Sequence, residues 1–233
     1  MLRVDGLDAG YGLSQVLWGI DLAVAPGEAA ALLGRNGVRK TTLLRTILGL
    51  HPRSAGRVLV GDAPAVDVTH LPAHRRARLG VGYVPQGRHI FPHLTVEENL
   101  FMGLATRPPR SAIPPRIFEM FPVLKTMLRR RGGDLSGGQQ QQLAIGRALA
   151  MQPRLLILDE PTEGVQPSII LQIEEALRRI CRELGVAVLL VEQYLELAWS
   201  FAASYFVMQK GRIVDRGRTS DGDARAVSRL LSV

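Results

Sequence analysis

The chain has 233 residues, 46% of them hydrophobic, with a single cysteine and a formal net charge of +8 at pH 7. This content is enough for a buried core and excludes a disordered chain, while the lone Cys181 excludes an internal disulfide framework and favours a reducing compartment. No apolar run approaches the ~20 residues that a membrane-spanning helix needs, and the charge leaves nucleic acid, an anionic membrane surface or a polyphosphate open as partners.

Short apolar runs near the N-terminus predict strands over residues 16–22 and 29–33, separated by a turn at Pro26-Gly27. After Lys40 the apolar positions recur with helical spacing until Gly49. The sequence therefore predicts a strand, a loop and a helix around residues 34–42.

The loop in this unit, Gly34-Arg35-Asn36-Gly37-Val38-Arg39-Lys40-Thr41-Thr42, has the composition of a phosphate-binding loop. Such a loop directs backbone amides at the β and γ phosphates, adds a lysine charge and points a helix N-terminus at the ligand. We expect these nucleotide-binding residues in it: Gly34, Asn36, Gly37, Val38, Arg39, Lys40, Thr41 and Thr42.

Arg39 departs from the phosphate-loop pattern, which has glycine immediately before the lysine. Glycine leaves space where the chain turns tightly, so the large side chain must point elsewhere. Pointing outward, it leaves the loop amides free; pointing inward, its guanidinium competes for phosphate or displaces Lys40. We keep two interpretations, a tolerated variant and a site with weakened ATP turnover.

Residues 87–150 differ from the rest because prolines at 108, 109, 114 and 115 interrupt helical stretches, predicted over 96–104 and 117–128. The segment Leu135-Ser136-Gly137-Gly138-Gln139 then opens another helix, which Ser136 can cap. Its two glycines would let a phosphate approach bare amides. Gly146, inside that helix, should cost ~1 kcal/mol relative to Ala and is interpreted as neutral for function.

The last third alternates between strands and helices. Strands are predicted over 155–158, 186–191 and 205–208, and helices over 168–184 and 195–202, with a hairpin over 208–214. This alternation predicts an α/β fold with a mainly parallel sheet covered on both faces.

Two adjacent carboxylates, Asp159 and Glu160, follow the apolar run Leu155-Leu156-Ile157-Leu158 and precede Pro161. In that context we expect Asp159 to hold Mg²⁺ through water, with the Thr41 hydroxyl as a direct ligand. Glu160 is then the candidate general base.

Together these three motifs resemble the ATP-binding cassette (ABC) family over essentially the whole chain. The resemblance implies a phosphate-loop NTPase core with an N-terminal antiparallel β subdomain and an inserted helical subdomain. It implies a single domain over 1–233, with the nucleotide-binding core at 1–86 and 151–233 and the helical part at 87–150. It also implies ATP and Mg²⁺ as cofactors, and two composite sites in a dimer, each closed by the partner's Ser136, Gly137 and Gly138.

Further residues take roles through the same resemblance. Tyr11 matches the aromatic residue that stacks on adenine, and Val16 accompanies it as nucleotide-binding. Gln86 matches the glutamine that senses Mg²⁺ and the γ phosphate, and Gln193 stands where most members have histidine. Its amide can still donate a hydrogen bond there.

A narrower resemblance is carried by residues 121–134, the glutamine run 139–142, and the segments 163–167 and 191–194. They are similar to the E-type ATP-binding subunit of bacterial urea importers, a group close to branched-chain amino acid importers. This implies two different ATP-binding subunits, two integral-membrane permeases contacted by residues 87–100, and an external solute-binding protein. Whether the ATP-binding subunits form a homo- or a hetero-dimer stays open. The expected location is peripheral, at the cytoplasmic face of the bacterial inner membrane.

Two alternatives stay open beside an importer ATPase. A nucleic-acid-acting ATPase of the same fold would explain the positive charge. Such proteins usually carry a long coiled coil or two cassettes, and this sequence shows neither. We therefore expect no nucleic acid partner. A catalytically weakened cassette paired with an active subunit would explain Arg39. The five histidines form no metal pattern with Cys181.

Overall fold

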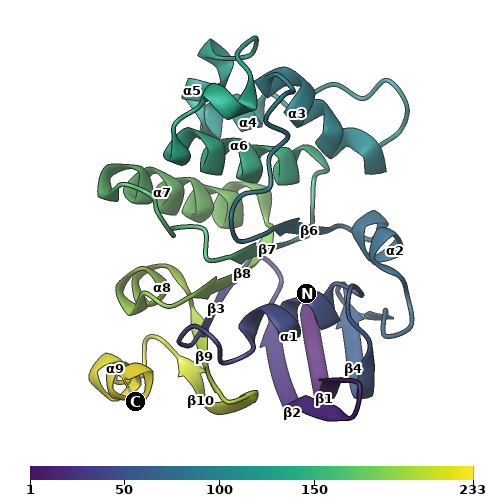
Figure 1. The fold of residues 1–233 in the computed structure, drawn as a ribbon, viewed down its shortest axis with the longest axis vertical. Helices are drawn as coiled ribbons and strands as arrows, with labels where there is room; N and C mark the ends of the chain where they lie inside the picture. The colour runs from purple at the N-terminus through teal and green to yellow at the C-terminus, as the bar shows by residue number, and fades with distance from the viewer. Residues whose placement is uncertain (233) are drawn as a thin grey trace.

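Two β-sheets and the helices around them make up the fold, which a computed structural model describes over residues 1–232. Figure 1 shows the larger sheet crossing the middle of the molecule, with helices α3 to α7 above it and α1 and the smaller sheet below.

The larger sheet has the strand order β10-β9-β3-β8-β7-β6. Neighbours from β9 to β6 are parallel and β10 is antiparallel to β9. Every residue of β3, β7 and β8 is buried, as expected for parallel strands covered on both faces. The strands are β3 (Ala29–Leu33), β6 (Val81–Val84), β7 (Leu155–Asp159), β8 (Ala187–Glu192), β9 (Ser204–Gln209) and β10 (Arg212–Arg218).

The smaller sheet is antiparallel, with the order β2-β1-β4-β5. Its strands are β1 (Leu2–Tyr11), β2 (Ser14–Val24), β4 (Arg53–Val60) and β5 (Val66–Asp67). Burial alternates along β2, so one face of this sheet is apolar and packs inward.

The helices lie in two groups on either side of the larger sheet. Below it are α1 (Lys40–Ile47) and, near the edge, α2 (Ala73–Arg78); above and beside it are α3 (Val96–Met102), η1 (Gly103–Thr106), α4 (Arg116–Met120), α5 (Pro122–Thr126), η2 (Gly132–Asp134), α6 (Gly137–Ala150), α7 (Pro167–Leu184), α8 (Leu195–Phe201) and α9 (Ala224–Ser232). Alternate residues of β3, β7 and β8 point into two separate hydrophobic cores, one for each face.

The predicted fold class is confirmed: the structure is α/β with an N-terminal antiparallel sheet and a mostly parallel sheet. One predicted element is wrong. The helix expected over 117–128 is two short helices, because Phe121 has φ −131° before Pro122, and a residue before proline is disfavoured in the helical region. The hairpin expected over 208–214 is present as β9 and β10.

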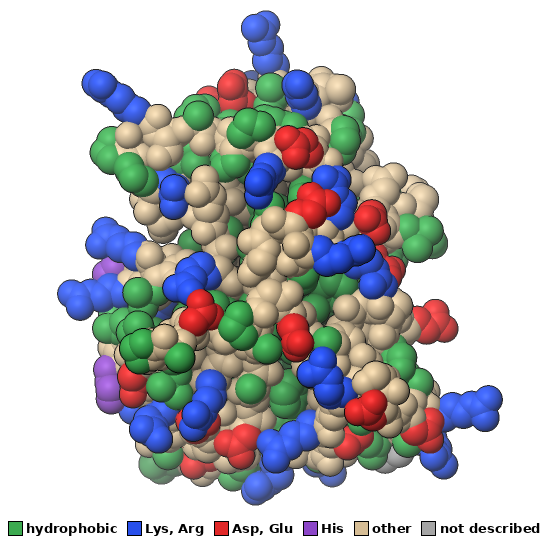
Figure 2. Space-filling view, turned by 180° about the vertical axis from the view of Figure 1, so that it is seen from behind, with side chains coloured by type: hydrophobic (Ala, Val, Ile, Leu, Met, Phe, Trp, Pro, Cys, Tyr) green, Lys and Arg blue, Asp and Glu red, His purple; other side chains and the backbone are tan. Residues whose placement is uncertain are grey.

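None of the helices described over residues 1–232 combines the length and apolar character needed to span a bilayer. On the face shown in Figure 2, basic and acidic side chains are interspersed rather than gathered into one large basic surface.

Candidate functional site

The loop from β3 to α1 forms one wall of a polar cavity of about 310 Å³. Eight of the residues assigned a role from the sequence line this cavity, together with Arg35, a loop residue to which no role was assigned. The lining residues are Arg35, Asn36, Gly37, Arg39, Lys40, Thr41, Thr42, Gln86 and Glu160.

Two glycines set the path of this loop. A Cβ on Gly34 would lie 2.8 Å from the Met208 carbonyl oxygen and 2.8 Å from a methyl group of Val38, so any side chain there would displace a neighbour. Gly37 has φ +83°, in the left-handed region that glycine enters without steric cost. The loop can therefore turn sharply and direct its amides at the cavity.

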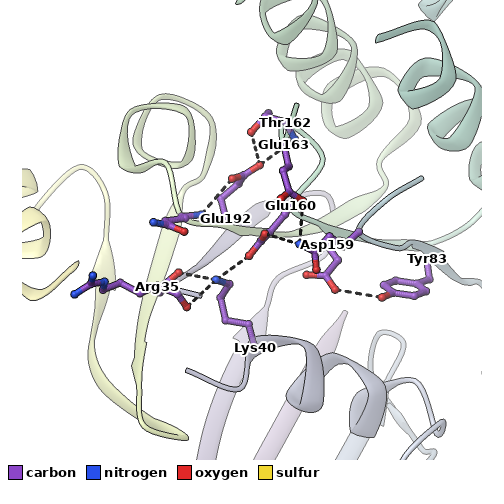
Figure 3. Close-up of polar contacts among 11 residues, drawn as sticks. Arg35, Lys40, Tyr83, Asp159, Glu160, Thr162, Glu163 and Glu192 are labelled. Carbon is purple, nitrogen blue, oxygen red and sulfur yellow. Dashed lines mark hydrogen bonds and ion pairs between the residues drawn. The ribbon is translucent and has the colours of Figure 1, made fainter. Parts of the chain in front are cut away.

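Lys40 is held at the centre of the site, with 4% of its surface exposed. Its Nζ donates to the Gly34 carbonyl oxygen at 2.6 Å and to the Arg35 carbonyl oxygen at 3.1 Å. The same atom lies 2.9 Å from Glu160 Oε1, an ion pair visible in Figure 3. Because the pair is largely withdrawn from water, an anion entering the cavity would compete with Glu160 for this ammonium group.

Arg39 takes a left-handed backbone conformation, with φ +85° and ψ +20°, at the N-cap of α1. Its side chain is exposed and lines the cavity, and within residues 1–232 it makes no hydrogen bond or ion pair. Lys40 keeps its contacts beside it, so the Arg39 side chain does not displace Lys40 in this structure.

Asp159 ends β7 with 1% of its surface exposed. Burial, and then the neighbouring charge of Glu160, raise its pKa to about 6, while the hydroxyls of Tyr83 and Thr41 oppose that rise. Tyr83 donates to Oδ2 at 3.3 Å, and Oδ1 is buried with no partner among the described residues. An unpartnered carboxylate oxygen facing Thr41 fits a hydrated Mg²⁺, since hard cations prefer oxygen ligands and Mg²⁺ usually keeps several waters.

Glu160 follows in a left-handed conformation, φ +48°, with its amide bonded to the Val191 carbonyl oxygen. Besides Lys40 it contacts Gln86, whose Nε2 donates to Glu160 Oε2 at 3.1 Å and to Glu163 Oε2 at 2.9 Å. The carboxylate is thus aimed into the cavity from the end of β7 and held on both oxygens.

Behind Glu160, the buried Glu192 ends β8 and was not predicted. Its Oε1 accepts from the Thr162 hydroxyl at 2.8 Å and the Thr162 amide at 3.2 Å, and its Oε2 from the Gln193 amide at 3.2 Å. Burial raises its pKa despite these bonds. The Glu192 network fixes the backbone on both sides of the site. It could have been suspected from a carboxylate ending a buried apolar strand, the same signal that marked Asp159.

The other predicted residues lie at or beyond the cavity rim. Tyr11 ends β1 with 48% of its surface exposed, and its hydroxyl is 3.4 Å from Thr42 Oγ1. Gln193 is exposed and makes no side-chain hydrogen bond within residues 1–232. Val16 is 8% exposed and packs in the hydrophobic core between the larger and the smaller sheet. Neither Gln193 nor Val16 lines the cavity, and their nucleotide roles stay predictions.

Ser136, Gly137 and Gly138 stand at the N-terminus of α6, and they also do not line the cavity. Ser136 caps the helix as expected: its hydroxyl accepts from the Gln139 amide at 3.4 Å, and the Gln139 side chain accepts from the Ser136 amide at 3.0 Å. A Cβ on Gly138 would lie 2.9 Å from Ile169. Their role in closing over a nucleotide therefore stays a prediction.

Comparison with known proteins identifies relatives of this arrangement. Residues 17–163 match the ABC transporter family. The chain is 41% identical over 216 residues to the high-affinity branched-chain amino acid transport ATP-binding protein BraG of Pseudomonas aeruginosa, covering 92% of this chain and 91% of that protein. It is 36% identical over 235 residues to the Fe(3+) ions import ATP-binding protein FbpC of Mesorhizobium japonicum, covering 99% of this chain and 64% of that protein.

Among solved structures, the chain resembles the ADP conformation of an ATP-binding cassette of an ABC transporter. The TM-score is 0.81 at 26% identity, and the match covers 100% of this chain and 95% of the other.

Proposed function

The chain belongs to the ABC transporter family, and we propose that it is the ATP-binding and ATP-hydrolysing subunit of a membrane importer. The observation that carries the proposal is the cavity in which the phosphate loop meets Glu160 from the end of β7, with Lys40 between them.

ATP with Mg²⁺ is the cofactor of such cassettes. We assign the triphosphate to the amides of residues 34–42 and to Lys40, and adenine to Tyr11 at the edge of the smaller sheet. Thr41, Gln86 and Asp159 would hold Mg²⁺, which supplies charge neutralisation on the phosphate oxygens.

Hydrolysis is assigned to Glu160 as general base for the attacking water, with Gln86, which bonds Glu160, and Gln193 as further catalytic residues. Without nucleotide, Lys40 and Gln86 engage both oxygens of Glu160. When phosphate draws Lys40 away, that carboxylate is released toward the reacting centre. The left-handed backbone at Glu160 keeps it aimed into the cavity.

A second ATP-binding subunit and membrane permeases are the partners of this family's importers. In our proposal a partner's Ser136, Gly137 and Gly138 close over the ATP held here. The helical part, residues 87–150, receives the permease through the exposed apolar side chains of Phe91, Phe101 and Met102. We therefore expect the chain at the inner face of a bacterial membrane.

For the transported solute we propose a branched-chain amino acid, or urea or a short amide. The likeness to BraG supports the first, and the segments resembling urea importer subunits support the second. The likeness to an iron importer subunit fits a cassette that does not touch the solute, so cargo must be tested on the assembled importer.

The alternative, a weakened cassette that depends on an active partner, is favoured by one observation, the non-glycine residue Arg39 at φ +85° lining the cavity. The intact Lys40 contacts favour an active site instead.

The test is Mg²⁺-ATP binding and turnover by the natural chain, by Arg39→Gly and by Lys40→Ala, each alone and with the paired subunit. Binding and turnover in the natural chain that match Arg39→Gly and disappear in Lys40→Ala support the active cassette. Turnover only in Arg39→Gly would support the alternative. ATP binding unaffected by Lys40→Ala would contradict the proposed site itself.

A further inference from the structure

His51 lies next to Tyr11 and has no role in the site described so far. The two ring centroids are 4.3 Å apart with an interplanar angle of 39°. The pair brings together the last residue of β1 and a residue of the loop between α1 and β4. Aromatic pairs at such spacing attract each other beyond the area they bury.

His51 is held by two hydrogen bonds, one to its ring and one to its backbone. Its Nε2 lies 3.0 Å from the Gly10 carbonyl oxygen, and its backbone amide donates to the Arg45 carbonyl oxygen of α1 at 3.1 Å. His51 is therefore tied both to β1 and to the helix that begins at Lys40.

Tyr11 by contrast has little else to hold it. It precedes the turn Gly12-Leu13 that joins β1 to β2, and Leu13 is fully exposed. Its hydroxyl meets Thr42 Oγ1 at a long 3.4 Å, and 48% of its surface is open. One contact at the hydroxyl tip leaves the ring free to rotate, whereas His51 restrains its plane.

We infer that His51 is a positioning residue that holds the Tyr11 ring in the orientation needed to stack on adenine. The inference rests on the proposed function, because it requires ATP at this site. It predicts that His51 contributes to nucleotide affinity through the base alone, since His51 itself does not line the cavity formed by the phosphate loop.

The experiment measures Kd by calorimetry for Mg²⁺-ATP and for Mg²⁺-tripolyphosphate, which lacks the base. His51→Ala should weaken ATP about 2- to 10-fold, the range expected of an aromatic pair, and leave tripolyphosphate unchanged. His51→Phe, which keeps a ring, should restore most of the ATP affinity. His70→Ala is the matched control: His70 contacts Arg53 rather than Tyr11 and should change neither Kd.

Coupling to Tyr11 is tested by a double-mutant cycle. If His51 acts through Tyr11, His51→Ala should have no further effect on ATP affinity in a Tyr11→Ala chain. Additive losses would mean that His51 touches the nucleotide itself and would overturn the positioning role. An unchanged ATP Kd in His51→Ala, or an equal loss for tripolyphosphate, would also overturn it.

The two ligands separate this inference from the proposed function. If the natural chain binds neither ATP nor tripolyphosphate, the nucleotide site is wrong and the role of His51 is overturned with it. If both bind and only the His51 variants behave unexpectedly, the site stands and the inference alone is wrong.

Discussion

At the scale of single residues, Arg39 shows how backbone conformation limits the choice of side chain. Its φ of +85° lies where an L-residue other than glycine is strained by about 1–2 kcal/mol. Glycine would remove that strain but loses roughly 0.5–1 kcal/mol through the freer unfolded chain. We expect Arg39→Gly to unfold with a free energy about 1 kcal/mol higher than the natural chain, measured by urea denaturation.

Arg39→Ala is the control for this prediction because it removes the guanidinium but keeps a Cβ. It should retain the strain and fall within about 0.5 kcal/mol of the natural chain, as is usual for an exposed residue. Equal stability of the glycine and alanine variants would show that the backbone at position 39 is unstrained.

Glu192 gives a prediction for pH. Burial raises its pKa above the ordinary value of 4.5, so the folded state favours the neutral acid more than the unfolded state does. Its contribution to stability is therefore fully present below pH 4.5 and is lost as pH rises through the higher folded pKa. Glu192→Gln, always neutral, should gain stability relative to the natural chain as the pH rises above 4.5 and through the folded pKa.

The measurement is the unfolding free energy of both proteins at several pH values, in the absence of nucleotide. A constant difference across this range would mean that Glu192 does not titrate differently in the folded chain. Thr162→Val serves as the control, since it removes the hydroxyl bond to Glu192 without removing the carboxyl group.

The sequence identified the residues of the phosphate loop, Asp159 and Glu160, because their chemistry is encoded in contiguous motifs. It did not identify Tyr83, nor Glu192, although Glu192 also ends an apolar run. Their place beside the site depends on the strand order that sets β6 and β8 on either side of β7. Order in a sheet is decided by crossovers between distant segments, which no local pattern records.

At the scale of elements, α6 packs so closely against its neighbours that two glycines set the distance. A Cβ on Gly103 would lie only 2.1 Å from the Arg147 carbonyl oxygen, a backbone atom that cannot step aside. A Cβ on Gly146 would lie 3.1–3.3 Å from methyl groups of Ile117, Leu124 and Leu100, which can shift slightly.

We therefore expect Gly103→Ala to destabilise the chain by about 2 kcal/mol or more, the upper part of the range for overpacking. Gly146→Ala gains ~1 kcal/mol of helix propensity against a similar overpacking cost and should change stability by less than about 1 kcal/mol. Thermal or urea unfolding of both variants checks the order. Equal losses would show that the helices separate to accommodate either side chain.

Apolar periodicity predicts single elements better than it predicts how they end and pack. It predicted β3 and the position of α7 closely, because each is a self-contained apolar or amphipathic run. It joined α4 to α5 by giving the helical pattern of 117–128 more weight than Pro122. It gave Gly146 a helix-propensity cost but no packing role, since the packing of α3, α4 and α5 on α6 cannot be seen from one helix.

For the whole molecule, the proposed function has Ser136 of one chain close over the ATP held by another, so we expect a complete site to need two chains. Each chain of a symmetric pair would give its phosphate loop to one site and its α6 N-terminus to the other. Two inactivating changes on different chains should then leave one intact site. If each site were formed within one chain, two chains that each carry one inactivating change could not restore activity when mixed.

Mixing a Lys40→Ala chain with a Ser136→Arg chain tests this directly. In the mixed pair, the Lys40→Ala chain supplies a normal Ser136 to the normal phosphate loop of its partner. With random pairing, half of the dimers are mixed and each has one intact site of two, so about a quarter of the natural ATPase activity should return. Each variant alone should be inactive. The mixture could remain inactive although the natural chain alone hydrolyses ATP. Either the two residues then do not meet across a dimer, or both sites must be intact for turnover. ATP-dependent dimerisation of the mixed chains, measured by sedimentation, separates these two outcomes.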